Sequence, residues 1–253
     1  MQKVFLERNS IVDGELCITG GDAHHIRDVL RMRPGEQLLV SCGDEWEYTC
    51  EITESDKEEI RARVIDAQRP GKELPCRVTL LQCLPKGDKM ETVIQKAVEL
   101  GAAEIVPVAS RRCVVKLDEK KAEARVRRWN TIAASAAAQA KRMIVPEVHA
   151  VLSLSEALRY ARSGAIRPRE EQPVLLLPYE HAEGMARTRQ IVGGIRPGQP
   201  VAVLVGPEGG FDEEEVRRAR EEGFEPITLG RRILRTETAG LATLSMLVYV
   251  LDE

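Results

Sequence analysis

Hydrophobic residues along this chain follow two different rhythms, which change near residue 75. Before that point, short runs such as GELCITG, QLLVSC, EWEYTCEI and EIRARVIDA are separated by DG, PG and GD pairs. Such runs are typical of closely spaced strands, and one helical stretch, DAHHIRDVLRM, interrupts them. Residues 1–70 are therefore predicted to form a small β-barrel, and RPGKELP at 69–75 has the composition of a linker.

After residue 75, apolar strand-like runs alternate with helical patterns. The strand candidates are RVTLLQCL, AEIVPVA, PVLLLP, PVAVLVG and FEPITLG. The helix candidates cover residues 87–101, 118–142, 212–223 and 238–251. Strands that alternate with helices indicate a mostly parallel sheet covered on both faces, so we expect an α/β domain over residues 75–253.

Two of the predicted helices begin with an acidic capping pattern. Asp88 is followed three residues later by Glu91, and Asp212 is followed in the same way by Glu215. In such a pair the first side chain accepts a hydrogen bond from the third helical N–H group. Gly101 stands where a left-handed residue would end the first of these helices.

Charge is distributed unevenly along the chain. The net charge of −3 results from −6 over residues 1–75, +7 over 76–145 and −4 over 146–253. A basic middle in an acidic chain is a candidate nucleic-acid surface. The alternative is the solvated face of a helix, because several of these cations lie in KKAEARVRR.

The composition indicates a cytoplasmic protein without a membrane segment. No apolar run approaches the roughly 18 residues that a membrane helix needs, and MQKVFLERNS lacks the apolar core of a signal peptide. The cysteines form no CxxC pair and, with four histidines, no zinc pattern, so we expect no metal site. Small buried thiols in a reducing cytosol are the simplest interpretation of Cys17, Cys42, Cys50, Cys76, Cys83 and Cys113.

The stretch VGPEGGF at 205–211 is a glycine-rich turn between a predicted strand and a predicted helix. Such turns often bind phosphate, but here the helix begins with four carboxylates at residues 212–215, which would repel it. Neither the P-loop nor the dinucleotide-binding spacing is present. The pattern favours a ligand that is not an anion, such as an adenosine that carries a thioether or sulfonium group.

Three predicted strands end in similar turns, at Pro178, Gly206 and Gly230. Ligands of open α/β sheets bind outside the carboxyl ends of the strands, so these turns predict one pocket with leucine walls and exposed peptide groups. The alternative is three ordinary turns without a shared ligand.

The same residues carry a family resemblance. VGPEGGF followed by LGRRILRTETA resembles the C-terminal signature of the SPOUT methyltransferases, in the branch that methylates N3 of a uridine in small-subunit ribosomal RNA. HHIRDVLRMRPGE, LPKGDKMETVIQKAVELGAAEIVPVASRRCVVK and RWNTIAASAAAQAKRMIVPEV resemble the family's other blocks in order. The chain departs from the family at Ala138 and Lys141, where an acid and a glycine are usual, and RSGAIRPREEQP at 162–173 is particular to this sequence.

The resemblance implies a fold and a function. Residues 1–70 would form a PUA-like β-barrel that binds RNA, and residues 75–253 a SPOUT methyltransferase domain with a deep trefoil knot. The enzyme would be a homodimer that uses S-adenosyl-L-methionine to methylate 16S ribosomal RNA at uracil N3, within an assembled 30S particle. The alternatives are a non-catalytic RNA-binding assembly factor and a SPOUT enzyme with another target.

The resemblance also implies site residues. Arg235 and Arg142 would bind or polarise the uridine, and Glu208 would take a proton or hold the cofactor's amine. Each has a structural alternative: Arg235 could brace loop carbonyls, Arg142 could bind phosphate and Glu208 could cap a turn. The predicted cofactor pocket consists of Leu176, Leu177, Pro178, Gly206, Pro207, Gly209, Gly210, Leu229, Gly230, Ile233 and Leu234. The predicted RNA contacts are Arg27, Arg31, Arg33, Lys86, Lys89, Arg111, Arg112 and Lys116.

Overall fold

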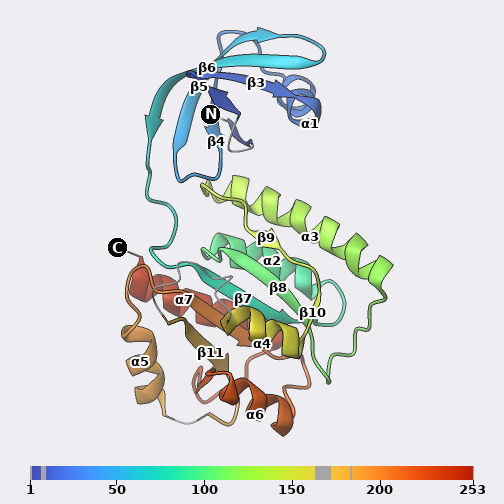
Figure 1. Ribbon diagram of the computed structural model, residues 1–253, viewed down its shortest axis with the longest axis vertical. Coiled ribbons are helices and arrows are strands. Elements are labelled where there is room, and N and C mark those ends of the chain that lie inside the picture. Colours follow the sequence, from blue (N-terminus) through green and yellow to red (C-terminus); the bar gives the residue numbers. More distant parts are fainter. Residues whose placement is uncertain (1, 7–9, 163–171, 183, 253) are drawn as a thin grey trace. The chain divides into compact units, whose positions relative to one another are not determined.

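The computed structural model describes residues 2–6, 10–162, 172–182 and 184–252 (Figure 1). The chain divides into two compact units. One contains residues 1–73 and 137–145, and the other contains residues 74–136 and 146–253. The segment at 162–173 that is particular to this sequence falls almost wholly outside the described residues.

The N-terminal unit is built on a six-stranded sheet with the order β1-β4-β5-β6-β3-β2. β1 pairs with β4 in parallel, and the other neighbours are antiparallel. One side of each strand faces a single apolar core, as Leu16 and Ile18 do in β3. The strands are β1 (Gln2–Phe5), β2 (Ile11–Val12), β3 (Glu15–Thr19), β4 (Gln37–Ser41), β5 (Glu47–Ser55) and β6 (Glu59–Gln68).

The helical stretch within this unit begins and ends a few residues earlier than its pattern predicts. α1 (Gly20–His24) continues into a π-helical turn over His25–Val29, and the helix ends there. Arg31 then adopts a left-handed conformation with φ of 56°. Ala23 and Ile26 reach the core of the unit, so the apolar periodicity of the stretch is correct although its bounds differ.

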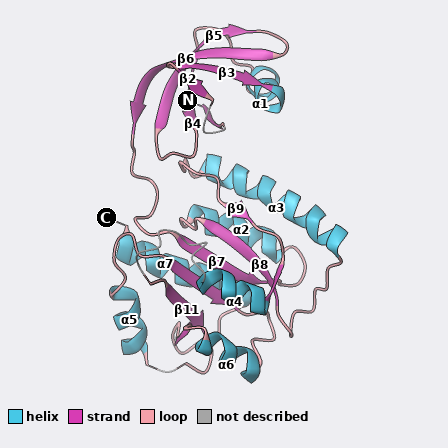
Figure 2. Cartoon of the chain, in the orientation of Figure 1, coloured by secondary structure: helices cyan, strands magenta, loops and turns pink. Residues whose placement is uncertain are grey.

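The C-terminal unit contains a seven-stranded sheet in which every pairing is parallel (Figure 2). Its order is β10-β8-β7-β12-β11-β13, and β9 pairs with β8 at the side. All five predicted strands are present, whereas β9 and β10 are two-residue strands that the pattern does not reveal. The strands are β7 (Val78–Cys83), β8 (Glu104–Ala109), β9 (Glu147–Val148), β10 (Leu152–Ser153), β11 (Val174–Pro178), β12 (Val201–Val205) and β13 (Glu225–Ile227).

Six helices accompany this sheet among the described residues (Figure 2). They are α2 (Lys89–Glu99), α3 (Glu119–Gln139), α4 (Leu154–Arg162), α5 (Met185–Gly193), α6 (Glu213–Glu221) and α7 (Thr236–Leu251). α2 buries the predicted apolar face, and α7 packs against α2, α5, β11 and β12. α4 and α5 were not predicted, and the other four lie where their patterns place them.

The two predicted capping boxes have different outcomes. Asp212 and Glu215 form a complete capping box at the start of α6, with Asp212 accepting from the Glu215 N–H at 2.8 Å. The prediction for Asp88 is wrong, because its side chain makes no capping hydrogen bond. Its backbone (φ −93°, ψ 9°) is not extended as capping requires, and Arg128 binds the Glu91 carboxylate at 2.8 Å.

Five of the six cysteines are buried, as expected, and all six are free thiols. Cys17 is the exception, because alternate residues of β3 face outward and its thiol lies 3.4 Å from Glu59. Among the described helices, none is long and apolar enough to cross a bilayer.

The C-terminus of α3 contains the departure from the family pattern at residue 141. Lys141 adopts a left-handed conformation with φ of 54°. The N–H groups of Lys141 and Arg142 donate to the carbonyls of Ala138 and Ala137, which is the Schellman arrangement that normally ends in glycine. The helix therefore stops at Gln139, before Arg142, and a lysine occupies a position that favours glycine.

We predict that Lys141→Gly stabilises the protein by about 1 kcal/mol, because glycine adopts this conformation without steric strain. The matched control is Ala140→Gly, one residue earlier, where no left-handed backbone is present and added chain entropy should lower stability. Denaturant unfolding of the two variants measures the difference. A lower midpoint for both would contradict the prediction.

Candidate active site

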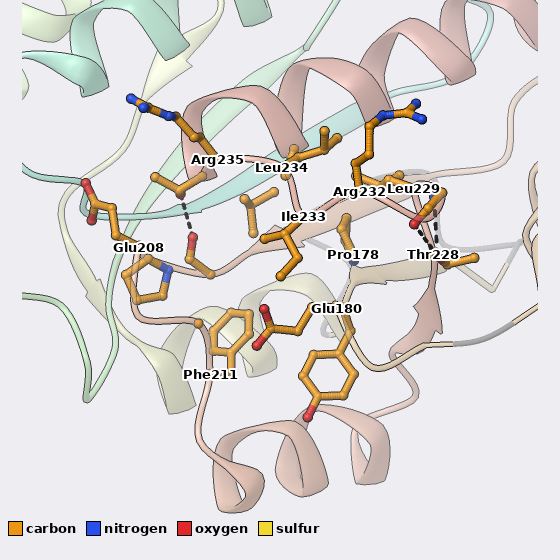
Figure 3. A pocket seen from close by; sticks show the side chains of 18 of the residues that line it. Pro178, Glu180, Glu208, Phe211, Thr228, Leu229, Arg232, Ile233, Leu234 and Arg235 are labelled. Atoms are coloured by element: carbon orange, nitrogen blue, oxygen red, sulfur yellow. Dashed lines mark hydrogen bonds between the residues drawn. The ribbon is translucent and has the colours of Figure 1, made fainter.

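A cavity of about 410 Å³ opens where β11, β12 and β13 reach their carboxyl ends (Figure 3). Parallel pairing of β11 with both β12 and β13 brings these three ends to one edge of the sheet. The walls come from the segments at 178–180, 205–211 and 228–236, which follow these strands, with Lys89 from α2 and Ala239 from α7. The three predicted turns therefore form one site.

Glycines allow the 206–211 turn to fold tightly at the cavity wall. A Cβ atom on Gly206 would lie 3.0 Å from the ring of Phe211, too close for an ordinary contact. Gly210 has a φ of 64°, which L-residues rarely adopt. Both glycines line the cavity, so the chain approaches it there with no side chain in the way.

A short chain of buried hydrogen bonds fixes the base of this turn. The hydroxyl of Thr236, at the start of α7, donates to the carbonyl of Gly206 at 2.5 Å. The same hydroxyl accepts a hydrogen bond of 2.9 Å from the side-chain amide of Gln82 in β7. Because all three groups belong to different segments, the turn after β12 is tied to both β7 and α7.

The 228–235 segment forms another wall. Thr188 in α5 binds the backbone of Thr228 twice, as a donor to its carbonyl (3.2 Å) and as an acceptor from its N–H (3.1 Å). Gly230 then turns the chain with a φ of 108°. Figure 3 shows Ile233 directed toward Glu180, whereas Arg232 and Arg235 extend outward. Ile233 is 82 % exposed, which is unusual for an isoleucine.

Glu208 is held by neighbouring donors. Its Oε1 accepts hydrogen bonds from the Lys86 N–H (3.0 Å) and the Lys89 ammonium (3.2 Å). Partial burial opposes ionisation of Glu208, but these hydrogen bonds outweigh it and lower the pKa of the carboxyl. A carboxylate of lowered pKa is a poor proton acceptor near neutrality, which favours a role in holding the turn over that of a general base.

Arg235 lies at the rim of the cavity with its side chain 81 % exposed. Its nearest carboxylate is that of Glu237, at 4.0 Å, and none of the described residues receives a hydrogen bond from its guanidinium. The arrangement does not match the alternative in which Arg235 braces loop carbonyls. Arg231 and Arg232 are exposed on the same rim, and within the described ranges neither has a carboxylate within 4 Å.

Most of the predicted cofactor residues line the cavity: Pro178, Gly206, Pro207, Gly210, Leu229, Gly230, Ile233 and Leu234. Leu176 and Leu177 do not line it, because both are fully buried within β11. Gly209 also lies outside the lining and faces Arg112. The sequence did not single out Tyr179, Glu180, Phe211, Thr228, Arg231, Arg232 or Thr236, although each directly adjoins a predicted residue along the chain or lies within two positions of one.

Arg142 is not part of the cavity lining. It belongs to the N-terminal unit, is only 3 % exposed and forms an ion pair with Glu73. Glu73 also accepts a hydrogen bond of 2.8 Å from the N–H of Met143. This pairing favours a structural role for Arg142 over direct contact with a substrate.

Some of the cations predicted to contact RNA already bind other groups of the chain, and some do not. Arg27 binds Asp28 and backbone carbonyls of the neighbouring 56–57 turn. Lys89, Arg111 and Arg112 bind groups in or beside the 206–211 turn. The remaining four are exposed, and in the described part of the chain none has a side-chain hydrogen bond or an ion pair: Arg31, Arg33, Lys86 and Lys116.

The start of α6 is unsuited to a phosphate. The Asp212 carboxylate already accepts the Glu215 N–H, and Glu213 and Glu214 place two more carboxylates in the first helical turn. A bound anion would meet this charge instead of free N–H groups. Over the described ranges there is also no cluster of three or more His, Cys, Asp or Glu residues that could hold a metal.

Comparison with known families assigns both units. Residues 72–248 match the family described as RNA methyltransferase domain, and residues 18–65 match the RNA methyltransferase PUA domain. The two matches together span most of the chain and fall on the two predicted regions.

Individual relatives are similar to this chain in sequence along almost its full length. The ribosomal RNA small subunit methyltransferase E of Bacillus subtilis is 37 % identical over 98 % of this chain and 96 % of its own. That of Mycobacterium tuberculosis is 32 % identical over 91 % and 85 %. A crystal structure of the Neisseria gonorrhoeae enzyme bound to S-adenosyl methionine superposes with a TM-score of 0.81, at 34 % identity over 99 % of this chain and 98 % of that one.

Proposed function

This chain belongs to the ribosomal RNA small subunit methyltransferase E family, and on that premise we propose that it methylates 16S ribosomal RNA at N3 of a uridine. The methyl donor is S-adenosyl-L-methionine, which the Neisseria gonorrhoeae relative binds. The observation that carries the proposal is the cavity at the carboxyl ends of β11, β12 and β13. We place the protein in the cytoplasm with its ribosomal substrate.

The residues around the cavity fit an adenosyl sulfonium better than a phosphate. The cavity volume lies within the range of small-molecule sites, and glycine backbone leaves room at its wall. Glu180 places a carboxylate on the lining, where it attracts a positively charged ligand, whereas the carboxylate of Glu208 is bound by Lys89. Pro178, Gly206, Gly210, Leu229 and Leu234 are proposed to hold the adenosyl group.

When bound, S-adenosylmethionine supplies a methyl group on a positively charged sulfur. The reaction replaces the N3 proton of uracil with this methyl group, so a proton must leave and the negative charge that develops on the base must be balanced. We assign the balancing charge to Arg235, whose guanidinium is exposed at the rim. Glu208 is bound by two donors and has a lowered pKa, so we assign proton acceptance to solvent.

Gly210→Val is expected to weaken S-adenosylmethionine binding about 100-fold, because the side chain would strain a left-handed residue and project at the cavity wall. Titration calorimetry measures the affinity, with ATP and NAD as competing adenosine ligands. Gly198→Val is the matched control, since Gly198 is also left-handed (φ 85°) but lies outside the lining.

If both valine variants lost affinity for S-adenosylmethionine equally, the loss would be due to backbone strain and not to the cavity. Absence of binding by the folded wild-type protein, with RNA present or absent, would favour the non-catalytic assembly factor.

Arg235→Ala is expected to lower kcat for methylation of 30S particles by about 100-fold, with the dissociation constant of S-adenosylmethionine changed less than about threefold. Arg232→Ala removes the same charge from the same segment and should act mainly on KM, because we assign Arg232 to RNA phosphate and not to the base. An unchanged kcat for Arg235→Ala would contradict the assignment of the balancing charge to Arg235.

We propose that RNA is held by cations of both units. In residues 1–70, which we propose as the PUA-like RNA-binding domain, Arg31 and Arg33 are exposed. In the proposed SPOUT domain, residues 75–253, Lys86 and Lys116 are exposed, and so are Arg231 and Arg232, which lie at the rim of the cavity. Phosphate contacts from such side chains position an RNA without reading its sequence, which suits a folded ribosomal target within an assembled 30S particle.

We also propose that the protein is a homodimer and that its C-terminal domain contains a trefoil knot. Support for a second copy comes from the last turns of α7, where every position from Met246 to Leu251 is apolar and two of these residues are exposed. A helix that is apolar all round is normally buried. Tyr249 is 88 % exposed on this helix, beside Val250. Support for the knot comes from the return of the chain after β13 to pack α7 on β12 and α2.

Light scattering should give a mass near twice 28.2 kDa for the wild-type chain and near 28.2 kDa for Tyr249→Glu, because the charge would be buried in the interface. Ile65→Glu, at an exposed apolar position of β6, is the control and should leave the mass unchanged. A monomeric wild-type protein would refute the dimer.

A further inference from the structure

The turn at 206–211 has an outer side that faces away from the cavity, and cations from two neighbouring loops bind it. Arg112 donates to the carbonyl of Gly209 at 2.9 Å. Lys89 contacts the carboxylate of Glu208 at 3.2 Å. These loops follow β7, which pairs with β12, and β8, which pairs with β7, so the same parallel sheet positions the turn and the groups that bind it.

Lys89 has a second partner, which makes it different from the other cations near the turn. Its ammonium lies 3.2 Å from Glu208 and 3.2 Å from Glu237, which is in the first turn of α7. The neighbouring carboxylates of Glu237 and then Glu208 raise the pKa of Lys89. One ammonium group therefore connects the 206–211 turn to the helix that directly follows the 228–235 segment.

The position of Lys89 along the chain explains why it reaches both carboxylates. It is the first residue of α2, directly after the 84–88 loop, and its side chain is 33 % exposed. It also lines the cavity. Lys86 belongs to the same loop, but only its backbone N–H binds Glu208. Among the described residues, no carboxylate lies within 4 Å of the Lys86 ammonium.

We infer that Lys89 is a positioning residue for the cofactor cavity: its ammonium holds Glu208 and Glu237 together and so sets the spacing of two cavity walls. The sequence pattern suggests a different role for it, as an RNA phosphate contact. A phosphate would have to compete with two carboxylates for Lys89, whereas the ammonium of Lys86 is free of such partners in the described ranges. This inference rests on the proposed function, because it takes the ligand of the cavity to be S-adenosylmethionine.

The test compares Lys89→Met with Lys86→Met, which remove the same charge from neighbouring positions. Titration with S-adenosylmethionine should show about tenfold weaker binding for Lys89→Met, equivalent to about 1.4 kcal/mol, and an affinity within about twofold of wild type for Lys86→Met. Lys89→Arg keeps the charge and should restore most of the affinity. Equal affinities for all three variants and the wild type would overturn the inference.

A double variant separates positioning from general stability. The double variant Lys89→Met with Glu208→Gln should bind S-adenosylmethionine more tightly than the sum of the two single losses predicts. The reason is that each change removes the same contact, the one between Lys89 and Glu208. Additive effects would mean that Lys89 acts on affinity without Glu208, and would overturn the role assigned to that contact.

Hydrogen exchange in the ligand-free protein provides a readout that does not depend on the proposed function. Backbone amides of residues 208–211 should exchange faster in Lys89→Met than in Lys86→Met or the wild type. If the wild type fails to bind S-adenosylmethionine but this difference is present, the proposed function fails and the restraint on the turn is still supported. If exchange is the same in all three proteins, the restraint itself is refuted.

Binding of a small-subunit RNA fragment should fall for Lys86→Met. An equal fall for Lys89→Met, with unchanged affinity for S-adenosylmethionine, would assign Lys89 to RNA and overturn the inference.

Discussion

The parallel pairing of β12 with β7 on one side and β11 on the other is the constraint on which the site depends. Parallel strands present their carboxyl ends at one edge, so the segments after β11, β12 and β13 must meet there. The loops after β7 and β8 emerge at the same edge, which brings Lys89 and Arg112 against the 206–211 turn. The parallel pairing of the strands therefore positions both the 206–211 turn and the side chains that bind it, Lys89 and Arg112.

Charged side chains of both signs surround the cavity. Carboxylates at the start of α6 are occupied by a capping box, and those of Glu180 and Glu208 lie on the lining. Arginines extend from the rim, where Arg232 and Arg235 point away from the cavity centre (Figure 3). The Glu180 carboxylate on the lining suits a cationic cofactor and the arginines at the rim suit RNA, so opposite charges around one cavity can serve two different ligands.

Cations that the sequence blocks predict as phosphate contacts need not be available to a nucleic acid. Arg27 and Lys89 were both predicted phosphate contacts from their places in the family's sequence blocks, yet each is bound to carboxylates of its own chain. Arg142 is a similar case, because its ion pair with Glu73 holds the chain just after α3. In contrast, Arg31 and Lys116 are exposed, although nothing in their sequence surroundings distinguishes them from the bound cations.

The sequence by itself determined the local features and the family. Strand and helix periodicity placed β7, β8, β11, β12 and α7, and GPEGG with LGRRILRTETA located the turns of the cavity. These features depend on neighbouring residues, so a linear pattern contains them. It could not exclude Leu176 and Leu177 from the lining, because burial in β11 depends on what packs across the sheet. Nor could it show that Glu180 and Phe211 face one cavity, that Asp88 fails to cap α2, or that Lys89 joins Glu208 to Glu237. Only the tertiary structure decided these points, because each depends on groups far apart along the chain whose distance is set by how the strands and helices pack.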